Sequence, residues 1–238
     1  MRILGVAALA AAVAFGPAEG KTFTWSFNSD ALTLDPHSSN NTFTNAFINN
    51  IYEGLTRHNA KMQIEPALAE RWELVSPTVW RFHLRRNVVF HDGSAFDADD
   101  VLFTWARLNT QGALVRPTIG PVKEVRRIDS HTVEFETSQP FPVFLAALTH
   151  FFVMDKEWSE RVGATTASDL SAQRESPAAR QANGTGPFRL RSREPDTRTV
   201  LEANPRWWDK AEHNLTEGVF QPIRSAATRT AALLSGAL

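Results

Sequence analysis

The chain has 238 residues, with 25 Lys and Arg against 26 Asp and Glu, 42% hydrophobic residues and no Cys. This composition is typical of a globular protein and excludes a chain that is disordered for want of apolar residues. A formal net charge of -1 gives no electrostatic attraction to nucleic acid, which is therefore not an expected partner. Without Cys there is no disulfide, no thiolate metal site, no cysteine nucleophile and no lipid-anchor cysteine.

Residues 1–20 have the pattern of a secretory signal peptide. Arg2 precedes an uncharged run from Ile3 to Phe15, which at about 13 residues is well short of the ~20 that a membrane-spanning helix needs. The small residues Ala18 and Gly20 suit cleavage before Lys21. The alternative is a buried N-terminal helix. No later apolar run approaches the length of a membrane span, so we expect a soluble mature protein outside the cytoplasm.

The first elements of the mature chain are predicted from two periodicities. Aromatic residues at every second position predict a strand; they are Phe23, Trp25 and Phe27. Apolar residues near every fourth position then predict a helix from Thr42; they are Phe43, Phe47, Ile51 and Leu55.

The middle of the chain predicts two hairpins and a helix between them. In the first hairpin, Trp80–Arg85 pairs with Val88–Phe90 across a turn. The second runs from Val122 to Glu136. Asp97 is the predicted N-cap of the helix, since Asp100 follows three residues later. The buried stripe of this helix is Val101, Trp105 and Leu108.

The last third of the chain is predicted as follows. An apolar helix runs beyond Pro142 to Phe151, and Ala164–Ala182 form an exposed connection. Two strands lie near Arg189–Arg191 and Thr199–Glu202. The remaining elements are a short helix that begins at Pro205, a strand over Val219–Arg224 and a helix from Ser225 that ends at Gly236.

No residue cluster predicts a metal, cofactor or catalytic site. His91 and the nearby acidic residues are explained by a turn and a helix start, without ligands converging from separated positions. The segment Gly184–Gly186 is followed by Pro187, which lacks a backbone donor, so a close backbone crossing is a better interpretation than a phosphate loop. There is no Gly-x-Ser-x-Gly motif, although two of the 26 acidic residues still allow a glycoside hydrolase.

The seven Trp residues invite a ligand-stacking interpretation. Trp80 and Trp105 fall on predicted buried faces and are assigned to the core. The sequence leaves three others open as core or ligand-contacting residues: Trp25, Trp207 and Trp208.

Several short segments, taken in order, resemble the extracytoplasmic solute-binding proteins of ABC transporters, family 5, which is the peptide, oligopeptide and nickel binding group. In the first half they are Leu34-Asp35-Pro36, Ile51-Tyr52-Glu53-Gly54-Leu55, Pro66-Ala67-Leu68-Ala69-Glu70, Phe82-His83-Leu84-Arg85-Arg86, Val89-Phe90-His91-Asp92-Gly93 and Asp99-Asp100-Val101. In the second half they are Gly184-Thr185-Gly186-Pro187-Phe188, Glu202-Ala203-Asn204-Pro205 and Ala231-Ala232-Leu233-Leu234-Ser235-Gly236.

The resemblance implies an α/β fold of the type II, cluster C-like periplasmic-binding-protein class, with two lobes that close on a ligand. It implies that residues 21–57 and 184–238 form the core of the first lobe, and that residues 58–183 form an inserted α+β subdomain. Family members are about twice as long as this chain. We therefore expect a truncated product that lacks the second lobe, together with the segment that returns to complete the first.

The resemblance implies a binding function without catalysis: a free, monomeric periplasmic protein that captures a di- or oligopeptide and delivers it to ABC permease subunits. Nickel complexes, sugars and opines are other ligands of the family. Because open α/β sheets bind ligands beyond the carboxyl ends of their strands, we expect two ligand-facing segments, Asn28, Ser29 and Asp30, and Asn183, Gly184 and Thr185. Asp30 is a candidate partner for a ligand amine or a solvated loop carboxylate. A secreted glycoside hydrolase and a non-binding fragment remain the alternatives.

Overall fold

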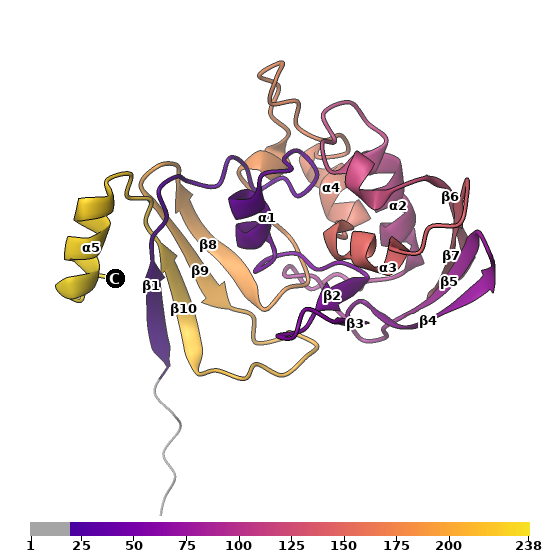
Figure 1. Cartoon of the computed structure of the whole chain (residues 1–238), viewed down its shortest axis with the longest axis horizontal. Coiled ribbons are helices and arrows are strands. Elements are labelled where there is room, and N and C mark those ends of the chain that lie inside the picture. The colour runs from indigo at the N-terminus through magenta and orange to yellow at the C-terminus, as the bar shows by residue number, and fades with distance from the viewer. Residues whose placement is uncertain (1–19) are drawn as a thin grey trace, which may run out of the picture.

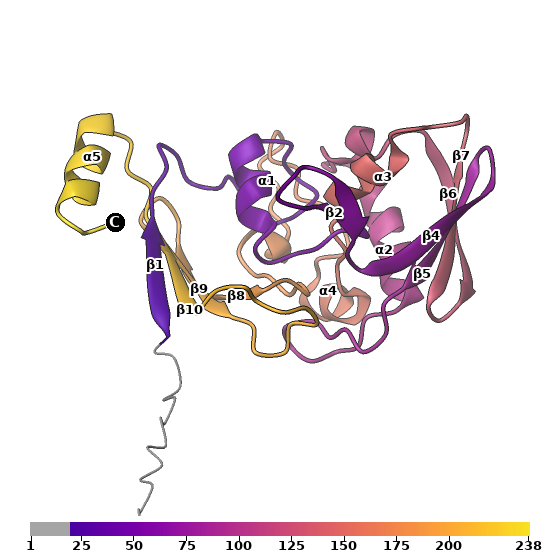
Figure 2. The same ribbon diagram turned by 60° about the horizontal axis from the view of Figure 1, so that its bottom comes forward.

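The computed structural model describes residues 20–238, so the predicted signal peptide lies outside the described residues except for Gly20. Two four-stranded sheets lie at opposite ends of the molecule, with helices α1 to α4 between them (Figure 1, Figure 2). Helix α5, Ala226–Leu234, stands beyond the first sheet and has no buried residue. Over the described part of the chain, no helix has the length and apolar character needed to cross a membrane.

The first sheet has the order β1-β10-β9-β8 and combines the start and the end of the chain. Its strands are β1 (Lys21–Trp25), β8 (Phe188–Glu194), β9 (Arg198–Ala203) and β10 (Leu215–Phe220). β1 pairs in parallel with β10, and the other pairs are antiparallel. The carboxyl ends of β1, β8 and β10 therefore lie at one edge of the sheet.

The second sheet has the order β4-β5-β7-β6 and is antiparallel throughout. Its strands are β4 (Ala69–Ser76), β5 (Val79–Leu84), β6 (Val122–Asp129) and β7 (Thr132–Thr137). The second predicted hairpin is confirmed by β6 and β7. The first is wrong, because β4 and β7 occupy both edges of β5 and leave Val89 with only an isolated bridge to Ala95. A small antiparallel pair, β2 (Thr56–His58) and β3 (Ile64–Pro66), lies before this sheet in the chain.

The predicted helix starts at Asp97 and Ser225 are confirmed. α2 (Ala98–Leu108) begins with a capping box, in which the Asp97 carboxylate accepts from Asp99 N at 2.7 Å and the Asp100 carboxylate accepts from Asp97 N at 2.9 Å. The apolar helix after Pro142 is present as α3 (Phe144–Ala147), continued by a 3₁₀ turn over Leu148–His150. α4 (Lys156–Val162), which Asp155 caps, was not predicted.

Three other predictions are wrong in part. Helix α1 (Thr42–Ile48) stops well before Leu55, because the chain turns there to meet the Gly184 segment; Ile51 and Leu55 are buried outside the helix. The chain after Pro205 forms a turn instead of a helix. The connection over residues 164–182 is not uniformly exposed, since several of its residues are buried; they are Ala164, Ala167, Ser168, Asp169, Ala178 and Ala179.

The buried apolar residues form two cores. One lies on the second sheet and takes its residues from Leu55 to Val153. The other lies on the first sheet and includes α1 together with Met154, Trp158, Ala164 and Ala178. The region after Val153 therefore packs with the first sheet, although the resemblance assigns residues 58–183 to the insertion.

Candidate functional site

The structure separates the six expected ligand-facing residues into two groups. Asn183, Gly184 and Thr185 lie inside the molecule, with Asn183 and Thr185 only 2% and 1% exposed. The Asn183 amide donates to Asp155 at 2.9 Å and accepts from the backbone N of Asp92 at 2.9 Å. These polar groups are bonded within the chain. The ligand-facing role of this segment stays a prediction.

The glycine segment does form the close backbone crossing that the sequence predicts. A Cβ atom on Gly184 would overlap the Ile51 carbonyl oxygen, and one on Gly186 would lie 2.7 Å from that carbonyl group. Gly186 N donates to Ile51 O at 2.9 Å, and His91 N donates to Gly184 O at 2.9 Å. Glycine is required at this crossing because any side chain would push the two backbones apart.

The buried Glu53 carboxylate forms hydrogen bonds with the same region. Its carboxylate accepts from Thr185 Oγ1 at 2.8 Å and from the indoles of Trp207 and Trp208 at 3.1 and 2.8 Å. Burial raises the pKa of the Glu53 carboxyl, although these three donors oppose the shift. The indoles of Trp207 and Trp208 therefore form hydrogen bonds inside the molecule. Arg85 lies over the Trp208 ring at 4.0 Å, which adds a cation–π contact.

Ser29 and Asp30 line a pocket of about 410 Å³ at the carboxyl ends of β1, β8 and β10. We call it the carboxyl-edge pocket. Its charged lining residues are Asp30, Glu175, Arg180, Arg193, Asp196 and Arg224. Asn28 precedes the pocket in the chain and is exposed. The pocket lies beyond the ends of strands that run in one direction, where ligands bind in open α/β sheets.

Asp30 forms the floor of this pocket with Arg193 of β8. The two side chains make contacts of 3.2 and 3.0 Å and are 9% and 7% exposed, respectively. Asp30 also accepts from the backbone N of Ala31 and Asp196, each at 2.8 Å. Both carboxylate oxygens are thus already bonded twice. The expected roles of Asp30, as a ligand-amine partner or a solvated carboxylate, do not fit this geometry.

Two further ion pairs lie at the rim of the pocket. Arg180 contacts Glu175 at 2.8 Å, with side chains 71% and 48% exposed. Arg224 contacts Asp196 at 3.4 Å, with side chains 82% and 69% exposed. These four groups therefore remain in contact with solvent, unlike the pair on the floor.

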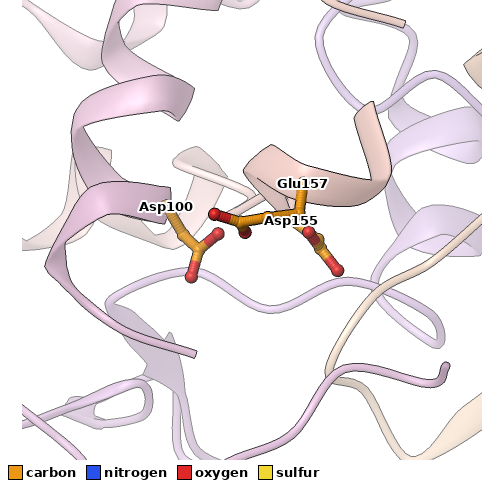
Figure 3. Close-up of side chains that lie close together, drawn as sticks. All are labelled: Asp100, Asp155 and Glu157. Atoms are coloured by element: carbon orange, nitrogen blue, oxygen red, sulfur yellow. The ribbon is translucent and has the colours of Figure 1, made fainter. Parts of the chain in front are cut away.

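A carboxylate cluster lies away from this pocket, where the N-termini of α2 and α4 meet (Figure 3). Asp100, Asp155 and Glu157 place carboxylate oxygens within 4.8 Å of one another. Asp100 accepts from the backbone N of Lys156 at 2.9 Å, and Asp155 accepts from Trp158 N at 2.8 Å. The cluster is thus explained by helix capping. Burial, together with the Asp155 carboxylate, raises the pKa of Asp100 to about 7.

A buried ion pair joins α2 to the N-terminal loop. The Arg107 guanidinium donates to both carboxylate oxygens of Asp35, at 2.8 and 2.7 Å, and both side chains are fully buried. Burial raises the pKa of Asp35, but Arg107 outweighs this and holds it well below its usual range. His37 accepts from Arg107 at 2.9 Å, and burial together with this cation lowers the His37 pKa to about 3. His37 is therefore neutral.

The comparisons with known proteins identify the family of the chain. The sequence model of bacterial extracellular solute-binding proteins, family 5 (middle) matches residues 63–238, which is more than half of the chain. The chain belongs to this family. The periplasmic oligopeptide-binding protein OppA of Salmonella typhimurium is 30% identical, with 94% of this chain and 44% of that protein covered. The dipeptide-binding protein of Escherichia coli is 29% identical, with 72% and 35% covered.

Solved structures confirm the predicted α/β fold of the type II class. The Helicobacter pylori periplasmic binding protein DppA, in complex with the peptide STSA, superposes with a TM-score of 0.81 at 25% identity; 92% of this family 5 chain and 46% of that chain are covered. The Burkholderia pseudomallei OppA superposes with a TM-score of 0.80 at 23% identity, with 93% and 46% covered. The chain thus spans less than half the length of the relatives and structures it matches.

A larger, apolar groove of about 610 Å³ lies beside α1 on the face of the first sheet. Its aromatic lining residues are Phe23, Trp25, Phe43, Phe47 and Phe188, and no Asp, Glu, Lys or Arg lines it. Trp25, which the sequence left open, contacts this groove and also packs against Phe47 and Phe220. The groove offers no charged group to orient a polar solute, in contrast to the carboxyl-edge pocket.

Of the six charged residues that line the pocket, only Asp30 was predicted; the other five are Glu175, Arg180, Arg193, Asp196 and Arg224. Arg189, Arg191 and Arg193 alternate along β8, but an irregularity between Leu190 and Ser192 interrupts the alternation, so this spacing does not assign Arg193 to a face. Their partners are acidic residues of other segments, Glu202, Glu217 and Asp30. Glu175 and Arg180 lie within the irregular connection over residues 164–182, and no periodicity marks them.

Proposed function

We propose that this protein is the solute-capturing component of an ABC importer, that it works in the periplasm, and that it binds a short peptide without catalysing a reaction. The observation that carries this proposal is the charged carboxyl-edge pocket at the strand ends, where a solute-binding fold meets its ligand. Relatives named for oligopeptide and dipeptide binding support a peptide as the solute. The partners in this proposal are the solute and the permease subunits of the importer, with the binding protein monomeric and no nucleic acid involved.

A secreted glycoside hydrolase is a weaker candidate. Such an enzyme needs two carboxyl groups on either side of a substrate cleft. The carboxylates of Asp100 and Asp155 hold helix N-termini, and Asp30 is held by Arg193. These contacts favour binding over hydrolysis.

The direct test is a titration of the purified chain with di- to pentapeptides, followed by amide chemical shifts. We expect saturable shifts at the carboxyl-edge pocket. The affinity should be weaker than micromolar, because ligand sites commonly bury about 70 to 90% of the ligand surface and this pocket is open on one side. Release of reducing sugar from polysaccharide, with no peptide-induced shift, would instead favour the hydrolase.

Export is tested separately, by intact mass of the protein recovered from the periplasmic fraction. The proposal expects a chain that begins at Lys21. A cytoplasmic protein that retains Arg2 would contradict the proposed location.

A further inference from the structure

The sequence contains a single Asn-Gly pair, Asn183–Gly184. An asparagine that precedes glycine is especially prone to deamidation, because glycine has no side chain to hinder attack by its backbone nitrogen. We propose that this pair is a modification site that only the unfolded chain presents, and that its modification prevents the chain from regaining the native fold. This inference does not depend on the solute and goes beyond the proposed function.

The reaction is intramolecular and needs only water as a second reactant. The backbone nitrogen of Gly184 attacks the side-chain carbonyl carbon of Asn183 and loses its proton. The carbon–nitrogen bond of the side-chain amide breaks, and ammonia leaves. Water then opens the resulting succinimide ring at either of its carbonyl groups. Residue 183 becomes aspartate or, when the main chain runs through the former side-chain carbonyl, isoaspartate.

The folded chain holds both reacting groups in place. Asn183 is 2% exposed; its Nδ2 donates to Asp155 Oδ2 at 2.9 Å, and its Oδ1 accepts from Asp92 N at 2.9 Å. The Gly184 nitrogen donates to His91 Nδ1 at 3.3 Å. Ring closure requires the Asn183 side chain to rotate out of these bonds, and the close packing of the glycine crossing opposes that movement. The native fold therefore blocks the first step.

Neither product fits the native contacts. Aspartate places a carboxylate oxygen where the Asn183 amide nitrogen lies, 2.9 Å from Asp155 Oδ2, and both residues are buried. Two carboxylates at this distance repel each other, and burial already raises the pKa of Asp155. Isoaspartate lengthens the main chain by one carbon directly before Gly184, where even a Cβ atom would overlap the Ile51 carbonyl oxygen. Both products therefore favour the unfolded chain.

The arginines of this region already contact acidic residues. Arg189 lines the same small pocket as Asn183 and contacts Glu202 at 2.7 Å. Arg161 contacts Asp92 at 2.8 Å. A new carboxylate at position 183 would compete with these acidic partners for a cation, so the arginines do not compensate it without loss elsewhere.

The modification therefore records the time that a chain spends unfolded. Because ammonia is released, the reaction is not reversed in water. A chain that folds promptly keeps Asn183 as asparagine, whereas a chain that stays unfolded loses it progressively. The site thus removes slowly folding chains from the population that can still reach the native state.

Incubation of the full chain at mildly alkaline pH, in native buffer and in guanidinium chloride, tests the first claim. Peptide mapping by mass spectrometry follows the conversion of residue 183 with time. We expect deamidation of Asn183 to be at least about 100-fold slower in native buffer, since opening of the folded state is rare. Asn28, which is exposed and precedes Ser29, is the internal control and should react at similar rates in both buffers.

Dilution of the aged, partly modified sample into native buffer tests the second claim. Size-exclusion chromatography separates chains that fold from chains that stay unfolded or aggregate. We expect the folded fraction to retain Asn183 and the other fraction to be enriched in aspartate and isoaspartate at this position. Deamidated Asn28 should be equally abundant in both fractions, because that residue is exposed.

Three variants test the physical reason. Asn183→Asp should lower the ratio of folded to unfolded chain at least about 100-fold, since a buried charge without a partner is strongly destabilising. Adding Asp155→Asn again sets one amide against one carboxylate, keeps a good helix cap, and should recover about tenfold. Asn28→Asp makes the same change at an exposed position and should alter the ratio less than about twofold.

Each outcome decides one claim. Equal deamidation of Asn183 in the two buffers, or none in guanidinium chloride, would overturn the assignment of the site. Modified chain that is equally abundant in the folded and unfolded fractions, or an Asn183→Asp variant as stable as the wild type, would overturn the exclusion from the native fold. A double variant no more stable than Asn183→Asp would overturn the role given to Asp155.

Discussion

Arg107 and Arg224 each pair with an aspartate, but their surroundings give the two pairs opposite uses. The Arg107–Asp35 pair is fully buried, and Arg107 also donates to the carbonyl oxygens of Ala164 and Thr166 at 2.8 and 2.9 Å. The Arg224–Asp196 pair is a single exposed contact. A buried pair cannot give up either member cheaply, so it acts as a joint between segments, whereas an exposed pair can exchange its partner for a ligand.

The largest expected effect on stability is at the buried Arg107–Asp35 ion pair. Arg107→Met should lower the free energy of unfolding by about 3 to 5 kcal/mol, because the Asp35 carboxylate would be left buried without its cation. Urea denaturation followed by Trp fluorescence measures this loss. Combining Arg107→Met with Asp35→Leu removes both charges and should recover a large part of it. A loss below about 1 kcal/mol in the single variant would contradict the structural role assigned to this pair.

The carboxylate cluster in Figure 3 extends the comparison to buried acids without a cation. The Asp100 carboxyl, with its pKa raised by burial to about 7 from 3.8, holds its proton more firmly in the folded state than in the unfolded state. Its contribution to stability is therefore fully present below about pH 4 and is lost as the pH rises through 7. Relative to Asp100→Asn, the wild type should gain about 2 kcal/mol between pH 8 and pH 5. Unfolding free energies measured at several pH values check this, and parallel profiles would contradict it.

The floor of the pocket should give an intermediate effect. Arg193→Met removes two contacts to Asp30 at a position where both side chains are nearly buried, so a loss of about 1 to 3 kcal/mol in unfolding free energy is expected. Arg193→Lys keeps the charge but not the two-pronged geometry and should lose less. If Arg193→Met lowered the free energy of unfolding as little as a rim variant does, the Arg193–Asp30 pair would be exchangeable like the rim pairs.

The smallest effect on stability is expected at the rim. Arg224→Gln should change the free energy of unfolding by less than about 0.5 kcal/mol, since its contact to Asp196 is long and exposed. A loss of stability as large as that of Arg193→Met would show that Arg224 is a structural residue and not a free ligand-binding group.

Local signals predicted much of the fold. The capping box at Asp97 and Asp100, the aromatic alternation of β1 and the glycine after α5 are each encoded within a few residues. The errors arose where contacts with distant segments of the chain determine the local structure. The helix that begins at Thr42 ends early because residues 50 and 51 bond to the chain around Gly186 and Phe188, which no local pattern reveals.

For the candidate site, the location at the strand ends was easier to predict than the lining residues. The rule for strand ends led to Asn28, Ser29 and Asp30, of which Ser29 and Asp30 line the carboxyl-edge pocket. The same rule also led to Asn183, Gly184 and Thr185, whose polar groups form hydrogen bonds with Asp155, His91 and Glu53 inside the molecule. The arginines of the pocket come from three separate segments, and only the folded chain brings them together.

The parallel pairing of β1 with β10 has a consequence for folding kinetics. Thr22 of β1 and Glu217 of β10 face each other although they are 195 positions apart, so the first sheet has very high contact order. During synthesis β1 has no partner until nearly all of the described chain has been made. The second sheet, formed from closer segments, can assemble earlier. Late closure of the first sheet leaves the emerging chain incompletely folded for most of its synthesis.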